Sequence, residues 1–150
     1  MQFAYRAMDT QGKIIRGSID AVNALDLEMR LKRMSLDLIA SKPSRALRNF
    51  QFGSPINRQE LINFCFHLEQ LLHAGVPIID ALVDLRDSVN KPQFREVLAN
   101  VIETIEGGKT LSESLAQQPR IFDTVFVNLV RSGEASGQLG EVLAKLTDNL

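Results

Sequence analysis

The chain has 150 residues, of which 45% are hydrophobic and 23% charged, and its formal net charge is −1. Such a composition is typical of one larger or two small globular domains and excludes collagen-like, low-complexity and wholly disordered chains. Because Cys65 is the single cysteine, a disulfide scaffold, a zinc finger and an iron–sulfur protein are excluded as well. No apolar run approaches the roughly 18 residues of a membrane-spanning helix. The N-terminus lacks a secretory signal, so we expect the chain to start inside the cell.

The first 42 residues predict a small ββαβ domain. Two β-prone runs, FAYRAMD at 3–9 and IIRGSIDA at 14–21, flank the turn residues DTQGK, which favours an antiparallel hairpin. A helix capped by Asn23 follows, and LDLIA at 36–40 predicts a third strand. The apolar face of that helix is expected to hold Leu25, Met29 and residues 31–34. A unit of this size is close to the smallest stable core, so we expect it to need a neighbour.

Residues 43–56 predict a linker, because this stretch is rich in Ser, Pro, Gly and Asn and has no sustained apolar period. Residues 57–150 then predict an all-α antiparallel bundle of six helices, since their apolar positions recur with the helical period. The fold class is therefore α+β overall. The sixth helix stays apolar to Leu150, and we expect it to continue beyond that residue.

The expected helix boundaries follow from capping residues. In chain order the signals are Gly75 and Pro77, the break at 90–92, Gly107 and Gly108, a capping box of Thr110 with Glu113, Pro119, Asp123 as a cap, and the GEASG turn at 133–137. The helix that Asp123 opens is expected to carry Val125, Phe126, Leu129 and Val130 on its apolar face. Two of these turns are similar: GVPIIDAL at 75–82 and GKTLSESL at 108–115 share a glycine, a helix-starting residue, an acid and apolar anchors. Helix capping alone explains that repeat.

No catalytic constellation can be assembled from these residues. His67 and His73 are not at the spacing of a metal pair, and Cys65 lies in an apolar stripe, where a thiol behaves as a small hydrophobe. GEASG at 133–137 follows a helix and is no hydrolase elbow, and EGGKT at 106–110 lacks the strand and glycine spacing of a phosphate-binding loop. We therefore expect no enzymatic activity and no cofactor.

The charge is unevenly distributed along the chain. Residues 1–56 hold nine basic and five acidic side chains, a net +4, whereas residues 57–150 hold eight basic and thirteen acidic ones, a net −5. A basic front half favours nucleic acid, anionic lipid or an acidic protein as partner, although two independently solvated domains would show the same asymmetry. For nucleic acid the candidates are Arg30, Lys32, Arg33, Arg45 and Arg48 on phosphates, and Phe50 and Phe52 on bases. A place next to the cytoplasmic face of a membrane is the other interpretation.

Several stretches together are specific enough to indicate a family. They are FAYRAMDTQGKIIRGSIDA with LDLIA at the front, RQELINFCFHLEQLLHAGVPIIDAL at 58–82, GKTLSESL, and FVNLVRSGEASGQL at 126–139. Over nearly its whole length the chain resembles the N-terminal cytoplasmic portion of the inner-membrane platform proteins of type II secretion systems and type IV pili, the GspF/PilC-like family. Such proteins continue into membrane helices and a second copy of the helical domain.

The resemblance implies a non-enzymatic scaffold in the bacterial inner membrane, with this region on the cytoplasmic side. Its expected partners are the hexameric assembly ATPase, other platform proteins, pilin or pseudopilin subunits and a second copy in a homodimer, and nucleic acid is not among them. The alternative is a small cytoplasmic nucleic-acid-binding or adaptor module that uses the basic front half.

The candidate site residues are interface residues. They are Arg30, Lys32, Arg33, Glu134 and Ser136. Glu134 and Glu141 could also share a face and hold a divalent cation or a basic partner, whereas two solvated helix acids remain the simpler interpretation.

Overall fold

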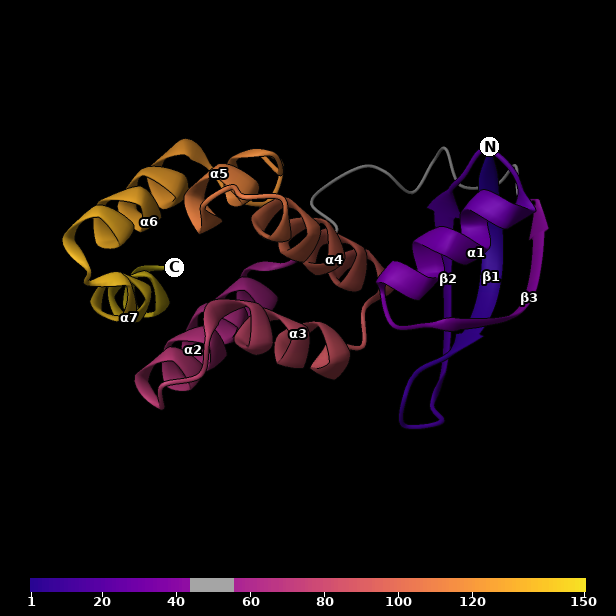
Figure 1. Ribbon diagram of the computed structural model, residues 1–150, viewed down its shortest axis with the longest axis horizontal. Coiled ribbons are helices and arrows are strands. Elements are labelled where there is room, and N and C mark those ends of the chain that lie inside the picture. Colours follow the sequence, from indigo (N-terminus) through magenta and orange to yellow (C-terminus); the bar gives the residue numbers. More distant parts are fainter. Residues whose placement is uncertain (44–55) are drawn as a thin grey trace.

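The computed structural model describes residues 1–43 and 56–150, which form a three-stranded sheet with one helix beside it and six further helices (Figure 1). The elements are β1 (Gln2–Met8), β2 (Ile14–Asp20), α1 (Ala24–Arg33), β3 (Asp37–Pro43), α2 (Arg58–His73), α3 (Ile78–Ser88), α4 (Pro92–Glu106), α5 (Leu111–Ala116), α6 (Thr124–Ser136) and α7 (Leu139–Asn149). The predicted α+β class is confirmed. The linker expected at 43–56 falls almost wholly outside the described residues, so the division into domains stays a prediction.

The sheet is antiparallel with strand order β2-β1-β3. Asp9 holds the predicted hairpin turn, because its carboxylate accepts hydrogen bonds from the main-chain N–H of Gln11 at 2.9 Å and of Lys13 at 2.8 Å. Gly12 has φ +81°, a left-handed conformation that suits glycine in such a turn. β3 pairs with the other edge of β1, and the register shifts between Arg6 and Ala7.

α1 covers one face of the sheet, and the apolar face expected for it was partly wrong. The buried positions are Leu27, Leu31 and, just after the helix, Met34, whereas Leu25 and Met29 are 68% and 60% exposed. The helical step of about 100° per residue explains the error, since Leu25 lies about 200° from Leu27 around the axis. The cap predicted at Asn23 is confirmed, because its side chain accepts from the N–H of Asp26 at 2.8 Å.

The six helices enclose one core, and their turns follow the predicted capping residues. Thr110 and Glu113 form the expected capping box. The repeated turn has a structural basis as well, because Gly75 and Gly108 both adopt a left-handed conformation, with φ +87° and +105°. The expectation for α6 was partly wrong: Phe126, Val127 and Val130 are buried, but Val125 and Leu129 are exposed. The stripe i, i+1, i+4 faces the core there, which turns both of those residues outward.

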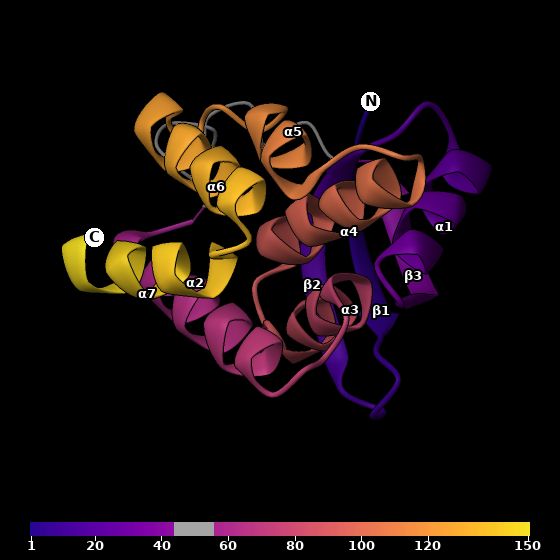
Figure 2. The ribbon, with the colours of Figure 1, turned by 60° about the vertical axis from the view of Figure 1, so that its left-hand side comes forward.

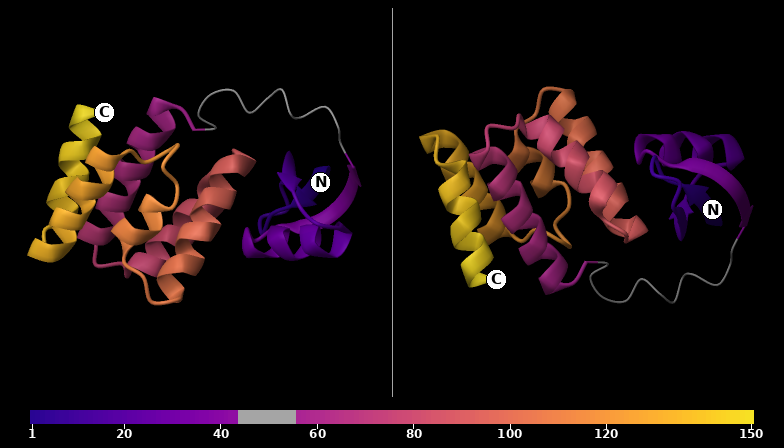
Figure 3. Two further views of the ribbon diagram at one scale, coloured as in Figure 1. Left: turned by 90° about the horizontal axis from the view of Figure 1, so that it is seen from above. Right: turned by 90° about the horizontal axis from the view of Figure 1, so that it is seen from below.

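The ββαβ unit lies at one end of the molecule and α6 and α7 lie at the other (Figures 1 and 2). α7 runs beside α2 in every view, although the two are far apart in the sequence (Figure 3). α3 and α4 are the helices nearest the ββαβ unit, and they form the junction described next.

Candidate interaction surfaces

α4 supplies the neighbour that the small ββαβ unit was expected to need. Ala99, on α4, is 4% exposed and belongs to the core of that unit together with Leu27 and Leu31. Gly17 of β2 meets the start of α4 so closely that a Cβ there would lie 2.8 Å from the Cβ of Pro92. The absence of a side chain at this position therefore permits the close approach of strand and helix.

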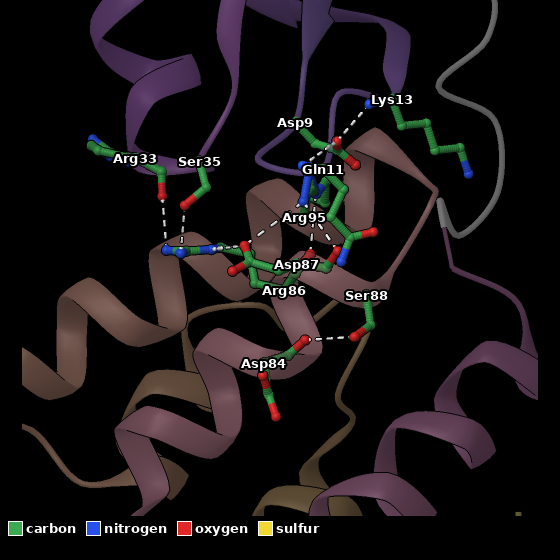
Figure 4. Close-up of polar contacts among 10 residues, drawn as sticks. All are labelled: Asp9, Gln11, Lys13, Arg33, Ser35, Asp84, Arg86, Asp87, Ser88 and Arg95. Carbon is green, nitrogen blue, oxygen red and sulfur yellow. Dashed lines mark hydrogen bonds and ion pairs between the residues drawn. The ribbon is translucent and has the colours of Figure 1, made fainter.

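A buried guanidinium lies at the centre of the junction (Figure 4). The side chain of Arg95, on α4, has no exposed surface, and its Nε donates to the carbonyl oxygen of Arg86 at 3.1 Å. Its Nη2 donates to the carbonyl oxygen of Asp87 at 3.4 Å and lies 3.7 Å from the carboxylate Oδ1 of that residue. Burial lowers the pKa of Arg95, while the nearby carboxylates of Asp87 and Asp9 raise it. These partners offset part of the cost of burying the charge, while Nη1 of Arg95 has no hydrogen-bond partner within residues 1–43 and 56–150.

Further polar contacts join the ββαβ unit to α3 and α4. Arg86 donates from Nη2 to Oγ of Ser35 at 2.6 Å and from Nη1 to the carbonyl oxygen of Arg33 at 3.2 Å. Arg33 in turn lies 3.0 Å from Oε2 of Glu103 and donates to Oδ1 of Asn100 at 2.8 Å. The C-terminal end of α1 is therefore attached to the helical part by several charged contacts.

Glu96 and Tyr5 are two titratable groups whose environment the junction alters. Burial raises the pKa of the Glu96 carboxyl, while Arg30 and Arg33 lower it. Burial also raises the pKa of the Tyr5 phenol, and the negative charge of Glu96 adds to that rise. Both groups therefore favour their neutral forms more than they would in water.

The predicted basic interface residues differ in whether they form ion pairs with other described residues. Arg30 pairs with Asp26 one turn earlier on α1, at 3.0 Å, and Arg33 is engaged at the junction. Lys32 is exposed and takes no part in an ion pair within residues 1–43 and 56–150. The other nucleic-acid candidates, Arg45, Arg48, Phe50 and Phe52, lie outside the described residues.

Glu134 caps a neighbouring helix. Its Oε1 accepts a hydrogen bond from the main-chain N–H of Ser112, in the first turn of α5, at 3.2 Å. Ser136 is exposed and its hydroxyl donates to the carbonyl oxygen of Ser132 at 3.0 Å, within α6. Glu141 is exposed on α7. Within the described ranges no group of three or more His, Cys, Asp or Glu side chains is arranged to hold a metal ion.

Of the side chains considered for catalysis, the cysteine is buried and the two histidines are exposed. Cys65 is fully buried in the core of the helical part, and desolvation raises the pKa of its thiol to about 12. His67 and His73 are exposed on α2. A thiol that stays protonated is a poor nucleophile, which agrees with a packing role.

A cavity of about 610 Å³ opens between α2, α3 and the start of α4. Its apolar walls include Phe64, Leu85 and Phe94, and its rim carries Glu60, whose Oε1 accepts from Nζ of Lys91 at 3.2 Å. Oε2 of Glu60 has no hydrogen-bond partner within residues 1–43 and 56–150. The cavity can accommodate an apolar side chain of a partner with a donor group beside it.

The sequence analysis singled out neither Arg95 nor Ala99, which are both buried. A signal was present: Arg95, Ala99 and Ile102 follow the spacing i, i+4, i+7 and form a second stripe on α4. None of the helices formed by the described residues is both long and apolar enough to cross a membrane.

Comparison with known proteins gives matches at both ends of the chain. Residues 64–150 match the family "Type II secretion system (T2SS), protein F", and residues 1–40 match "Type II secretion system protein F, N-terminal domain". The type II secretion system protein F of Vibrio cholerae is 32% identical over 97% of this chain, and that of Xanthomonas campestris is 30% identical over 99%. The type IV pilus assembly protein PilC of Thermus thermophilus is 31% identical over 99%.

The chain spans 37 to 38% of the length of these three relatives. The family match covers more than half of the chain, and the relatives align over almost all of it. The chain therefore belongs to the family of type II secretion system protein F and type IV pilus assembly protein PilC.

Proposed function

We propose that this chain is a non-enzymatic scaffold of the inner-membrane platform that assembles a type IV pilus or a type II secretion pseudopilus. In this role it lies on the cytoplasmic side and binds the hexameric assembly ATPase and other platform proteins. The assembled machine then moves pilin or pseudopilin subunits. Family membership supports the role in such a machine.

The junction between the ββαβ unit and α3–α4 is the observation that carries the proposal. A fully buried Arg95, the Arg33–Glu103 ion pair and the placement of Ala99 in the core of the ββαβ unit hold the two parts together. A scaffold that transmits movement needs its surfaces held in a fixed arrangement, and contacts between named polar groups of two elements fix how those elements lie against each other.

The proposed interface lies on α1 and at the turn between α6 and α7. On α1 the candidates are Arg30, Lys32 and Arg33, and Lys32 is the one free of ion pairs within the described ranges. At the turn they are Glu134 and Ser136, which lie on one helix. A second copy of the chain is proposed to bind elsewhere on α6, where Val125 and Leu129 are 67% and 42% exposed and lie one turn apart.

Binding of the purified chain to its assembly ATPase, measured by isothermal titration calorimetry, tests the proposal. Lys32→Glu and Ser136→Arg should each weaken binding by about 10-fold or more if their surfaces are used, since a reversed charge or an added bulky side chain acts at a contact. Lys145→Glu, exposed on α7, is the matched control. If the wild-type chain fails to bind the ATPase, or all three variants bind like wild type, the proposed docking is wrong.

The nucleic-acid module remains the competing function. It predicts that the chain shifts an oligonucleotide in a gel and that the shift weakens steeply with salt. The internal pairing of Arg30 and Arg33 speaks against it, because paired cations are less available to phosphates.

A further inference from the structure

The outer face of the sheet, turned away from α1, carries three basic side chains. The register places Arg6 of β1 directly opposite Arg16 of β2, and it sets Ala4 beside Lys42 of β3 one step along. Arg6, Arg16 and Lys42 are exposed. None of them forms an ion pair with another described residue of 1–43 or 56–150.

This arrangement has a cost for the fold. Like charges directly opposite each other on adjacent strands destabilise a sheet. Asp20 and Asp37 occupy the two ends of the same face, opposite Gln2 and Met8, and Asp20 is paired with the N-terminal ammonium at 2.7 Å. Positive charge is therefore concentrated in the two middle rows, where an external anion would relieve the repulsion.

The three cations surround a depression of about 390 Å³. The short side chains of Ala4 and Ala40 line it together with the longer basic ones, and no carboxylate belongs to its described lining. Two guanidinium groups beside each other offer several N–H donors in a planar geometry that matches phosphate oxygens. The depression therefore fits a phosphate group approached from solvent.

Large apolar side chains adjoin the cations on the same face. Met8 and Ile14 form the next cross-strand pair on that face and are 39% and 51% exposed. Apolar side chains next to basic ones are typical of protein surfaces that lie on a bilayer: the apolar groups enter the headgroup region and the cations meet the lipid phosphates.

We propose that this face, made of Arg6, Arg16, Lys42, Met8 and Ile14, binds the phosphodiester headgroups of anionic phospholipids at a bilayer surface. The choice of a bilayer over another polyanion rests on the proposed function, which attaches the chain to a membrane machine. The face would then hold the ββαβ unit flat against the membrane while the helical part remains free for protein partners.

Cosedimentation of the chain with lipid vesicles tests this inference. Binding is expected to vesicles of phosphatidylcholine mixed with phosphatidylglycerol, to fall as salt is raised, and to be absent with phosphatidylcholine alone. The double variant Arg6→Gln/Arg16→Gln should bind about 30-fold more weakly, because two basic contacts are lost. Its melting temperature should be unchanged or higher, because the like-charge pair is removed.

The matched control is Arg120→Gln/Lys145→Gln, which removes the same charge from exposed positions of the helical part. It should bind vesicles like wild type. The inference is wrong if the wild-type chain does not bind anionic vesicles, or if both double variants lose binding equally. It is also wrong if inorganic phosphate or an oligonucleotide binds at Arg6 and Arg16 while vesicles do not bind. ATPase binding measured on the same variants separates the two proposals, because a failure on vesicles with normal ATPase binding overturns this inference alone.

Discussion

The guanidinium of Arg95, on α4, donates to the main-chain carbonyl oxygen of Arg86, on α3, at 3.1 Å, and its side chain has no exposed surface. The contact lies beneath the β1–β2 hairpin, where Figure 4 shows Asp9 next to Arg95. One charged side chain thus connects two helices directly and faces the hairpin. Because a buried charge is tolerated only with partners, this junction should be sensitive to small changes.

Arg95→Ala should lower the free energy of unfolding by roughly 2 to 4 kcal/mol, because it removes packing and leaves buried carbonyl groups without their donor. Urea denaturation followed by circular dichroism measures the change. Arg120→Ala, at an exposed position, is the control and should stay within about 0.5 kcal/mol of wild type. Equal stability of the two variants would show that the buried charge contributes little.

Gly17→Ala should destabilise the chain by about 1 to 3 kcal/mol, because the new Cβ would lie 2.8 Å from Pro92 and from the Tyr5 hydroxyl. Hydrogen exchange should rise mainly in β1 and β2, where the ββαβ unit meets α4. Gly140→Ala has no atom within 4 Å of its Cβ and should be neutral or stabilising by up to about 1 kcal/mol. If Gly17→Ala left the stability unchanged, β2 and α4 would have to move apart to accommodate the new Cβ without a loss of free energy.

Glu134→Ala should cost about 1 to 2 kcal/mol, because the N–H of Ser112 loses its charged acceptor at the start of α5. Glu141→Ala, on an exposed position of α7, should change stability by less than about 0.5 kcal/mol. Thermal melts of both variants make the comparison. Equal losses, or a shift of the melting temperature on adding calcium that both variants abolish, would instead favour a shared cation site.

Glu96→Gln should flatten the dependence of stability on pH. Burial raises the pKa of Glu96 above its usual 4.5. At pH values just above 4.5 the folded chain therefore still holds a proton that the unfolded chain has lost. Stability therefore falls as pH rises from 4.5 through the raised folded-state value, and the uncharged glutamine removes that slope. Urea titrations at several pH values measure it. A wild-type slope in Glu96→Gln would contradict the burial argument.

Local signals in the sequence predicted the elements well. Asn23, Thr110 and Asp123 all cap helices as expected, because a capping side chain interacts with N–H groups two or three residues away. The errors concern which way a helix faces: Leu25 and Met29 on α1, and Val125 and Leu129 on α6, are exposed. An apolar residue on a short helix is compatible with several stripes, and only the neighbouring element selects one.

The candidate surfaces were less predictable than the elements. Glu134 was recognised as notable, but its partner Ser112 is on another helix and is 22 residues away. The pairing of Arg6 with Arg16 depends on strand register, which the hairpin turn sets and which composition does not reveal.

The order and type of the elements, their capping residues and the family were determined by the sequence alone, because they depend on interactions within a few residues or on motifs read directly from the chain. Tertiary structure decided the rest. The burial of Arg95, the role of Ala99 in the ββαβ core, the contact of Gly17 with Pro92 and the basic outer face of the sheet all join segments that are distant in the chain. Contacts of that kind arise from the packing of whole elements against each other, and no local pattern specifies them.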